Sequence, residues 1–231
     1  MSIVLASYNI HRCVGMDGRY DIGRVVEVIR ALDADVIALQ EVDFPLGGPA
    51  VDLLDLLAHE TNLVPIAGPT IYSDVGHYGN ALLTRAEVLA VRRFTLAQHG
   101  REPRGALDVD LRCDDVRFQV VATHLGLRPF ERRNQIRRIL TLFRGGREPA
   151  ALLGDFNEWL PWGRPVRWMH RFFGKPPAPA TFPSFLPVFA LDRVWVHPLR
   201  ALRRIEPVKT PVARRASDHL PVRAVVEWKD L

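Results

Sequence analysis

The hydrophobic and polar positions of the chain alternate between two periods, one typical of strands and one typical of helices. Residues 3–10, with the sequence IVLASYNI, form a short β-rich run, as expected for a strand. The stretch that begins at Asp21 places Val25, Ile29 and Leu32 on one helical face, and Asp is a preferred residue at helix N-termini. Strands that alternate with helices along the sequence predict an α/β layered fold.

Further elements follow from the same two periods. Strands are expected at 36–40, 77–85, 105–113, 116–127, 149–157, 187–198 and 219–228. Helices are expected at 50–60 and 130–143. In the second helix the apolar side chains share one face, and the other side carries Arg132, Arg133, Arg137 and Arg138. Residues 159–187, rich in Pro, Trp and Phe, are predicted to combine a short helix with a long loop.

Composition limits the class of protein. The chain has 231 residues, of which 48% are hydrophobic and 25% charged, as in soluble globular domains. No repeat or low-complexity linker divides it, so a single domain over 1–231 is predicted. Membrane spans need about 18 apolar residues, and no run approaches that length. The N-terminal MSIVLAS is too short for a signal peptide, so a cytoplasmic protein without a transmembrane segment is expected.

The charge balance points to an anionic partner. Lys and Arg together number 31 against 26 Asp and Glu, a net charge of +5, and almost all of the basic residues are arginines. A basic surface favours nucleic acid, phosphorylated metabolites or acidic lipid, and the planar guanidinium of arginine suits phosphate. Cys13 and Cys113 stand far apart without zinc-site spacing, which favours reduced thiols.

Polar side chains able to bind metal ions or phosphate gather where the predicted strands end. They are Asn9, His11, Glu41, Asp43, Asn80, His124, Asp155, Asn157, Asp192, Asp218 and His219. Such groups at the ends of buried strands usually face a cavity, because an unpaired buried charge is costly. Oxygen ligands suit Mg²⁺ or Mn²⁺, and two histidines can supply acid and base for attack by water. The set therefore favours metal-dependent hydrolysis of a phosphoryl ester.

Signatures of other chemistries are absent from the sequence. The glycines of GHYGNALL and FRGGRE match neither the GxxxxGK[ST] phosphate loop nor the Rossmann GxGxxG spacing. The chain also has no GxSxG nucleophile elbow. A covalent serine or cysteine mechanism therefore has little support.

Seven motifs in a fixed order carry a family resemblance. From residue 7 to residue 222 they are SYNIH, LQEVD, GNALLTR, THLGL, GDFN, LDRVWV and SDHLPV. This series resembles the endonuclease/exonuclease/phosphatase superfamily of deoxyribonuclease I-like phosphoesterases, and the compact length is similar to that of small bacterial members. The resemblance implies a four-layer α/β sandwich, with two mixed β-sheets facing each other between helices. It does not identify the substrate, because this fold serves several phosphate esters.

The resemblance also implies a metal site and a water-activating site. Glu41 corresponds to the direct Mg²⁺ ligand (Mn²⁺ is the alternative ion), Asn9 to its neighbour in the metal site, and Asp218 to a second acidic metal-site residue. Asp155 and Asn157 of GDFN correspond to the residues that position the attacking water and contact the scissile phosphate.

Two histidines complete the implied catalytic set. His219 corresponds to the general base or to a phosphate-contacting imidazole, and Asp192 to the carboxylate that orients it, which would stabilise its protonated form. His124 corresponds to the acid of the deoxyribonuclease and sphingomyelinase branches.

Three further residues are candidates for supporting roles. Asn80 lies in a family motif and is expected to bind substrate. In REPRGAL, Glu102 resembles a carboxylate that supports the catalytic histidine, and Arg104 is placed to clamp a substrate phosphate. A surface ion pair at a strand entrance explains Glu102 and Arg104 nearly as well.

The expected reaction is hydrolysis of a phosphodiester by in-line attack of water, which His219 or Asp155 activates. A phospholipid headgroup is placed slightly ahead of nucleic acid. The lipid interpretation uses the aromatic and basic segment 159–175, which suits peripheral contact with the anionic inner membrane surface. The nuclease interpretation uses the arginines of 132–147. A soluble phosphomonoesterase ranks third, and a non-enzymatic phosphate- or membrane-binding module is the remaining alternative.

Overall fold

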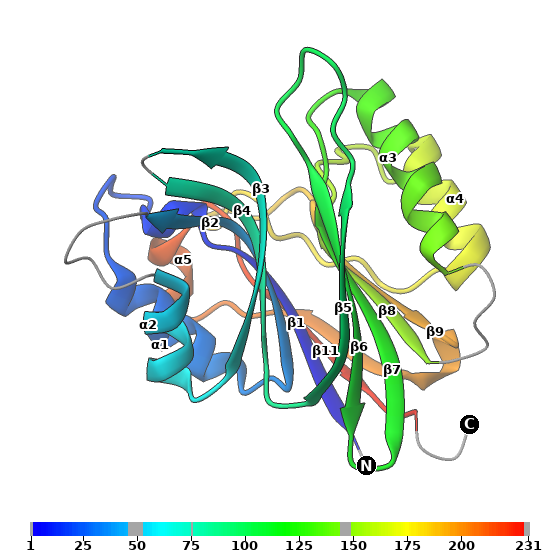
Figure 1. Ribbon diagram of the computed structural model, residues 1–231, viewed down its shortest axis with the longest axis horizontal. Coiled ribbons are helices and arrows are strands. Elements are labelled where there is room, and N and C mark those ends of the chain that lie inside the picture. Colours follow the sequence, from blue (N-terminus) through cyan, green and yellow to red (C-terminus); the bar gives the residue numbers. More distant parts are fainter. Residues whose placement is uncertain (1, 46–52, 75, 144–148, 229–231) are drawn as a thin grey trace.

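Two β-sheets face each other and helices cover both outer faces in the computed structural model (Figure 1). It describes residues 2–45, 53–74, 76–143 and 149–228. The architecture is the α/β sandwich that the motifs imply, and the sheets are mixed as expected.

The first sheet has the strand order β10-β11-β1-β2-β4-β3. Its strands are β1 (Ile3–Asn9), β2 (Val36–Pro45), β3 (Val64–Ser73), β4 (Gly76–Thr84), β10 (Leu202–Pro207) and β11 (Val222–Val226). Strands β1 and β2 are parallel, and the other neighbours are antiparallel. The carboxyl ends of β1 and β2 therefore lie at the same edge.

The second sheet has the order β5-β6-β7-β8-β9. Its strands are β5 (Glu87–Thr95), β6 (Gly105–Cys113), β7 (Val116–His124), β8 (Ala150–Asp155) and β9 (Asp192–His197). Strands β7 and β8 are parallel, whereas β9 runs antiparallel to β8. The start of β9 therefore lies at the same edge as the ends of β7 and β8.

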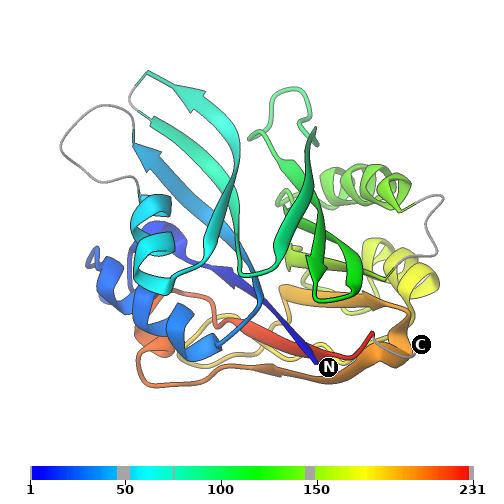
Figure 2. The ribbon, with the colours of Figure 1, turned by 60° about the horizontal axis from the view of Figure 1, so that its bottom comes forward.

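Helices on opposite outer sides complete the layers (Figure 2). On the first sheet they are α1 (Ile22–Leu32), α2 (Leu53–Thr61) and α5 (Ala213–Ala216), and on the second they are α3 (Pro129–Leu142) and α4 (Arg164–Phe173). Two 3₁₀ turns, His11–Cys13 and Leu199–Ala201, connect elements. Among the described residues, no helix is long and apolar enough to cross a bilayer.

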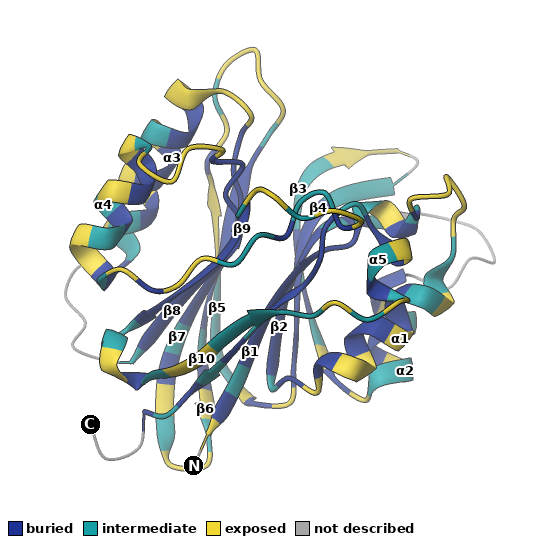
Figure 3. Ribbon diagram, turned by 180° about the vertical axis from the view of Figure 1, so that it is seen from behind, coloured by how far each residue is buried: buried dark blue, intermediate teal, exposed yellow. Residues whose placement is uncertain are grey.

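Three apolar clusters hold the layers together, and the central strands are buried on both faces (Figure 3). In β1, Ile3 and Leu5 join the cluster between the sheets, whereas Ala6 and Tyr8 join the cluster under α1 and α2. A strand covered on both faces needs apolar residues at successive positions. This explains the nearly continuous apolar runs of the sequence.

Most predicted elements are present, and three strands were not predicted. Asp21 caps α1, because its side chain accepts a hydrogen bond from the backbone N–H of Arg24 at 3.2 Å. The unpredicted strands are β3, β5 and β10. Strand β5 is an edge strand with few fully buried positions, so its hydrophobic alternation is weak. The part of the predicted helix 50–60 before Leu53 lies outside the described residues.

The arginines of α3 do not all lie on its solvent side, which corrects the prediction. Arg132 is buried and forms an ion pair with buried Glu158 at 3.1 Å. Arg137 lies over the ring of Trp168, with 4.9 Å from its guanidinium carbon to the ring centroid. Helical periodicity separated apolar from charged residues, but a long side chain can reach back under the helix to a partner.

Candidate active site

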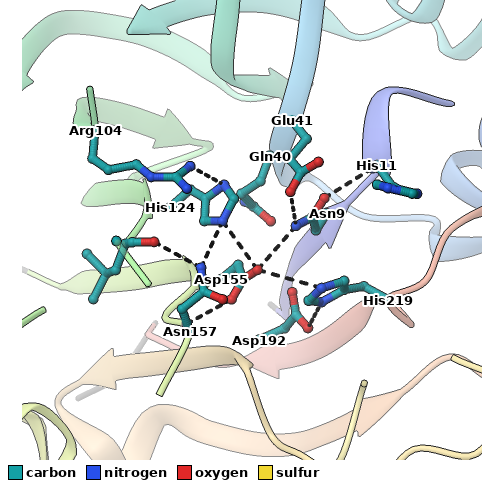
Figure 4. Close-up of polar contacts among 12 residues, drawn as sticks. Asn9, His11, Gln40, Glu41, Arg104, His124, Asp155, Asn157, Asp192 and His219 are labelled. Atoms are coloured by element: carbon teal, nitrogen blue, oxygen red, sulfur yellow. Dashed lines mark hydrogen bonds and ion pairs between the residues drawn. The ribbon is translucent and has the colours of Figure 1, made fainter. Parts of the chain in front are cut away.

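Strand register brings the predicted site residues to one edge of the paired sheets (Figure 4). His124 at the end of β7 is paired with Asp155 at the end of β8, which in turn is paired with Asp192 at the start of β9. Residues paired across neighbouring strands point to the same face of a sheet. On the facing sheet, Asn9 ends β1 beside Gln40 of β2.

Asp155 is the centre of the site. One carboxylate oxygen, Oδ2, lies 3.1 Å from Nδ2 of Asn9, 3.5 Å from Nε2 of His124 and 3.7 Å from Nε2 of His219. The other oxygen, Oδ1, accepts the backbone N–H of Asn157 at 2.9 Å. Both sheets therefore contribute donors that surround this buried carboxylate.

His219 is held on Asp192. Its Nδ1 lies 2.8 Å from Oδ2 of Asp192, which also accepts the hydroxyl of Thr181 at 2.6 Å. Burial lowers the pKa of His219, but the negative charges of Asp192 and Asp155 more than offset it, so the pKa rises to about 10. At neutral pH the ring is a cation that directs Nε2–H toward Asp155.

His124 has the opposite electrostatics. Burial, and then the charge of Arg104, lower its pKa to about 3. The guanidinium of Arg104 always donates, and its Nη1 lies 3.0 Å from Nδ1 of His124, so the remaining proton resides on Nε2. Nδ2 of Asn157 lies 3.0 Å from Nε2 and donates to the carbonyl of Leu125 at 2.9 Å, so it cannot accept the Nε2 proton; Oδ2 of Asp155, at 3.5 Å, is the acceptor on that side. The structure thus holds His124 as a neutral ring with one N–H, and its role as an acid stays a prediction.

The low pKa of His124 predicts acid-sensitive stability. The unfolded chain binds a proton there near the ordinary pKa of 6.5, whereas the folded chain does so only near 3. This stabilisation is complete above pH 6.5 and is lost progressively as the pH falls toward 3. In urea denaturation over this range, we expect His124→Gln to have a shallower pH dependence than wild type. Replacement of exposed His59 by Gln is the control, and an unchanged slope in His124→Gln would contradict the assignment.

Glu41 lies on the facing sheet at a backbone irregularity. The pairing of β2 with β4 shifts register between Leu39 and Val42, and Glu41 has a positive φ of 58°. Asn157 also has a positive φ of 47°. Such conformations cost about 1–3 kcal/mol each and tend to occur at functional sites.

Carboxylates accumulate around Glu41. Burial raises the pKa of Glu41, and the charges of Asp218 and Asp155 raise it further, against the hydrogen bond from Asn9 and the charge of His11. In the part of the chain that the structure describes, no Lys or Arg forms an ion pair with Glu41, Asp155 or Asp218. Asp155 faces the cationic ring of His219, whereas among the described residues Glu41 and Asp218 have neither Lys nor Arg as a partner, and carboxylates of this kind fit a divalent cation.

Asn9 positions this group through its amide nitrogen. Its Nδ2 donates to Oε1 of Glu41 at 3.2 Å as well as to Asp155, and its Oδ1 accepts the backbone N–H of His11 at 3.0 Å. In this geometry Asn9 joins two carboxylates, and its Oδ1, which accepts one hydrogen bond, keeps a second lone pair, so its place in the metal site stays a prediction.

Asp155, Asp192 and His219 form a second cluster with metal-ligand chemistry, their ligand atoms lying within 4.8 Å of one another. However, Oδ2 of Asp192 already accepts both Thr181 and His219. A hydrogen-bonded acid–base group therefore describes this cluster better than a metal centre, and Glu41 remains the better ligand.

The other predicted residues lie around Arg104. Arg104 is buried, and Glu102 pairs with it at 3.2 Å while remaining exposed. This contact is the ion pair that the sequence offered as the alternative, and the support of a catalytic histidine by Glu102 stays a prediction. Asn80 is buried and donates to the carbonyl of Gly105 at 3.3 Å, so it holds the first residue of β6, directly after Arg104.

Sequence reasoning missed three residues that shape the site. Thr181 bonds Asp192, and the hydroxyl of Ser217 connects the carbonyl of Asn9 at 2.7 Å with the backbone N–H of His219 at 3.1 Å. The ring of Phe182 lies 4.8 Å from that of His219. Ser217 directly precedes Asp218 and His219, so its place in the motif was a signal. Thr181 and Phe182 had none.

Fold and site together define a class of protein: an α/β sandwich with carboxylates and two histidines at one edge of its facing sheets. The model of the endonuclease/exonuclease/phosphatase family matches residues 6–219. The chain belongs to this family, whose members include phosphodiesterases, nucleases and phosphatases, are mostly hydrolytic enzymes and typically depend on a divalent metal.

Relatives extend over almost the whole chain. The uncharacterized protein YbhP of Escherichia coli strain K12 is 27% identical over 251 aligned residues, covering 97% of this chain and 96% of YbhP. An endonuclease/exonuclease/phosphatase from Beutenbergia cavernae has a TM-score of 0.77 at 22% identity, covering 98% of this chain and 71% of its own. A protein of unknown function from Enterococcus faecalis has a TM-score of 0.78 at 18% identity, covering 97% and 99%. At these identities the two structures support the fold alone.

Proposed function

We propose that the protein is a divalent-metal-dependent phosphodiester hydrolase that acts by in-line attack of water. The observation that carries the proposal is the position of Asp155, within 3.7 Å of nitrogen atoms from Asn9, His124 and His219. A buried carboxylate that contacts groups from both sheets can accept a proton from water. The cationic His219 beside it stabilises negative charge on a phosphate.

Donors on the other side of Asp155 suit a phosphate group. Arg104 is buried, and its Nε has no hydrogen-bond acceptor among the described residues. Together with the N–H of His124 and the amide of Asn157, it forms a surplus of donors over acceptors. A phosphate oxygen satisfies such donors, so these three side chains bind and orient the ester.

Glu41 and Asp218 are the residues that would hold the metal ion, with Asn9 keeping Glu41 beside Asp155. When bound, Mg²⁺ or Mn²⁺ supplies positive charge that offsets the charge of the phosphate. Glu41 and Asp218 bear the uncompensated negative charge that such an ion requires.

For the substrate we place a phospholipid headgroup ahead of nucleic acid. Buried Arg132 is bonded to Glu158 and so cannot neutralise a polynucleotide backbone, which weakens the arginine argument for a nuclease. Arg144 and Arg147 lie outside the described residues. Exposed apolar side chains beside the site favour an amphiphilic ester.

Hydrolysis of bis(p-nitrophenyl) phosphate in Mg²⁺ or Mn²⁺ tests the reaction class. We expect metal-dependent turnover by wild type and a loss of at least about 10²-fold in Glu41→Ala and His219→Ala, because each removes a charge that acts on the transition state. The control is Glu87→Ala, which breaks an exposed ion pair between Glu87 of β5 and Arg112 of β6. Undiminished turnover by either folded site variant would defeat the assignment.

A substrate panel separates the alternatives. Supercoiled plasmid, single-stranded RNA and mixed anionic phospholipid vesicles are each incubated with Mn²⁺. Release of a headgroup from vesicles is the expected result, and plasmid nicking without lipid turnover would replace the lipid proposal by the nuclease. Vesicle binding without hydrolysis of any substrate would favour the non-enzymatic module.

A further inference from the structure

Two turns beside the site expose large apolar side chains. The first turn, 158–163, carries Trp162, which is 68% exposed. The second, 183–189, carries Leu186 and Val188, which are 63% and 61% exposed. The two turns together are called the apolar turns here, and their exposed large apolar side chains are Trp159, Leu160, Trp162, Phe185, Leu186, Val188 and Phe189. Clustered exposure of this kind marks an interaction surface.

A chain of ring contacts connects the apolar turns to the catalytic edge. The ring of Trp159 lies 4.6 Å from that of Phe189 and 5.8 Å from that of Phe182. Phe182 in turn contacts the ring of His219. The first turn also begins directly after Asn157. Anything that covers these turns therefore lies next to Asp155 and His219.

Packing accounts for Phe173 and Trp168 of α4, but not for Trp162 and Phe185 of the turns. Phe173 is buried against Phe143, with 5.1 Å between ring centroids, and Trp168 is covered by Arg137. Trp162 and Phe185 have no ring partner among the described residues. Packing of rings against α4 therefore does not explain why Trp162 and Phe185 are exposed.

The stretch of sequence that carries the apolar turns has charged side chains of one sign only. No Asp or Glu occurs between 159 and 191, whereas this stretch contains Arg164, Arg167, Arg171 and Lys175. Glu158, just before it, is buried and neutralised by Arg132. Arg164 and Arg167 are exposed at the start of α4, directly after Trp162. Apolar rings bordered by cations match an anionic lipid surface, where rings enter the headgroup region and cations meet phosphate.

We propose that the apolar turns dock the protein on an anionic lipid–water interface, with Trp162 and Leu186 as the inserting side chains and Arg164 and Arg167 as the contacts to lipid phosphate. The inference rests on the proposed function for its substrate, since docking places the phosphodiester of a lipid headgroup at Asp155. Exposed apolar side chains bordered by cations suit the headgroup region of an anionic bilayer.

Co-sedimentation of the full chain with vesicles tests the docking surface. The vesicles are phosphatidylcholine with or without phosphatidylglycerol, in chelator, so that no turnover occurs. We expect wild type to bind only vesicles with phosphatidylglycerol, and Trp162→Ala/Leu186→Ala to bind about tenfold more weakly or worse. Arg164→Gln/Arg167→Gln should weaken binding and reduce its salt dependence. The control, Val64→Ala/Tyr72→Ala, removes similarly exposed apolar groups from β3 and should bind as wild type.

Turnover of bis(p-nitrophenyl) phosphate separates this inference from the reaction itself. The Trp162→Ala/Leu186→Ala variant should hydrolyse this soluble ester within about twofold of wild type, which also shows that it is folded, because its changes lie outside the charged site. Vesicle binding that survives this double change, or wild type that binds neither kind of vesicle, overturns the docking surface. If wild type does not hydrolyse the soluble ester, the proposed function is overturned, whereas the vesicle-binding result is unaffected.

Discussion

Replacing Asp192 with Asn is expected to lower kcat for a soluble phosphodiester by roughly 10³- to 10⁴-fold, the size of effect seen when a buried carboxylate that orients a catalytic histidine becomes an amide. Asp192 is fully buried, and its Oδ2 accepts Nδ1 of His219 at 2.8 Å. An Asn of the same shape offers no negative charge to an imidazolium. If its amide nitrogen faces Nδ1, it favours the opposite tautomer of His219.

The pH dependence gives this prediction a signature that mere misfolding lacks. Burial lowers the pKa of His219 and Asp192 raises it, with Asp155 assisting, to about 10 from an ordinary 6.5. The raised pKa of His219 stabilises the folded state fully below pH 6.5, and this stabilisation is lost as the pH rises to about 10. The difference in free energy of unfolding between wild type and Asp192→Asn should therefore shrink over that interval.

Two variants serve as controls for Asp192. Thr181→Val removes only the hydroxyl that bonds Oδ2 at 2.6 Å and should cost much less in kcat than Asp192→Asn. Asp110→Asn removes a carboxylate that pairs with Arg92 on the edge of the second sheet and should leave kcat unchanged. Equal kcat values for Asp192→Asn and Asp110→Asn would refute the role of Asp192.

The largest expected effect on stability is that of Arg132→Ala, which should lower the free energy of unfolding by about 3–5 kcal/mol because it leaves the buried charge of Glu158 without its partner. Arg132 and Glu158 are 3% and 4% exposed. Arg132 also donates through Nη1 to the carbonyl of Leu127 at 2.6 Å. The ion pair joins α3 to the segment that directly follows Asp155 and Asn157, so its loss should also reduce activity.

Urea denaturation of a double variant tests whether the unpaired charge of Glu158 causes the loss of stability in Arg132→Ala. Arg132→Met/Glu158→Gln removes both charges, and we expect it to be more stable than Arg132→Ala alone. Arg203→Ala breaks an exposed ion pair with Glu227 at 2.7 Å and should change the free energy of unfolding by less than about 1 kcal/mol. If Arg132→Ala costs no more than Arg203→Ala, the buried pair is not a significant contributor.

The sequence by itself determined the elements that build the site. Runs of apolar residues ending in Asn9, His124 and Asp155 predicted strands with polar residues at their carboxyl ends. Parallel strands bring such ends to one edge of a sheet. The seven motifs in their order carried the resemblance to the family, and the family match confirms it. The strands needed only local periodicity, and the resemblance needed only the motifs as they stand in the sequence.

Tertiary structure alone decided which side chains contact each other and which remain exposed. Arg132, expected in solvent, is buried on Glu158, and Arg104, expected to clamp a substrate phosphate, contacts both His124 and Glu102. Thr181 reaches Asp192 across 11 residues of irregular chain, and Trp162 is exposed whereas Phe173 is buried. Periodicity reports the face of an element on which a residue lies. Burial, partners and pKa depend on contacts between elements far apart in sequence, and only the packed layers supply these.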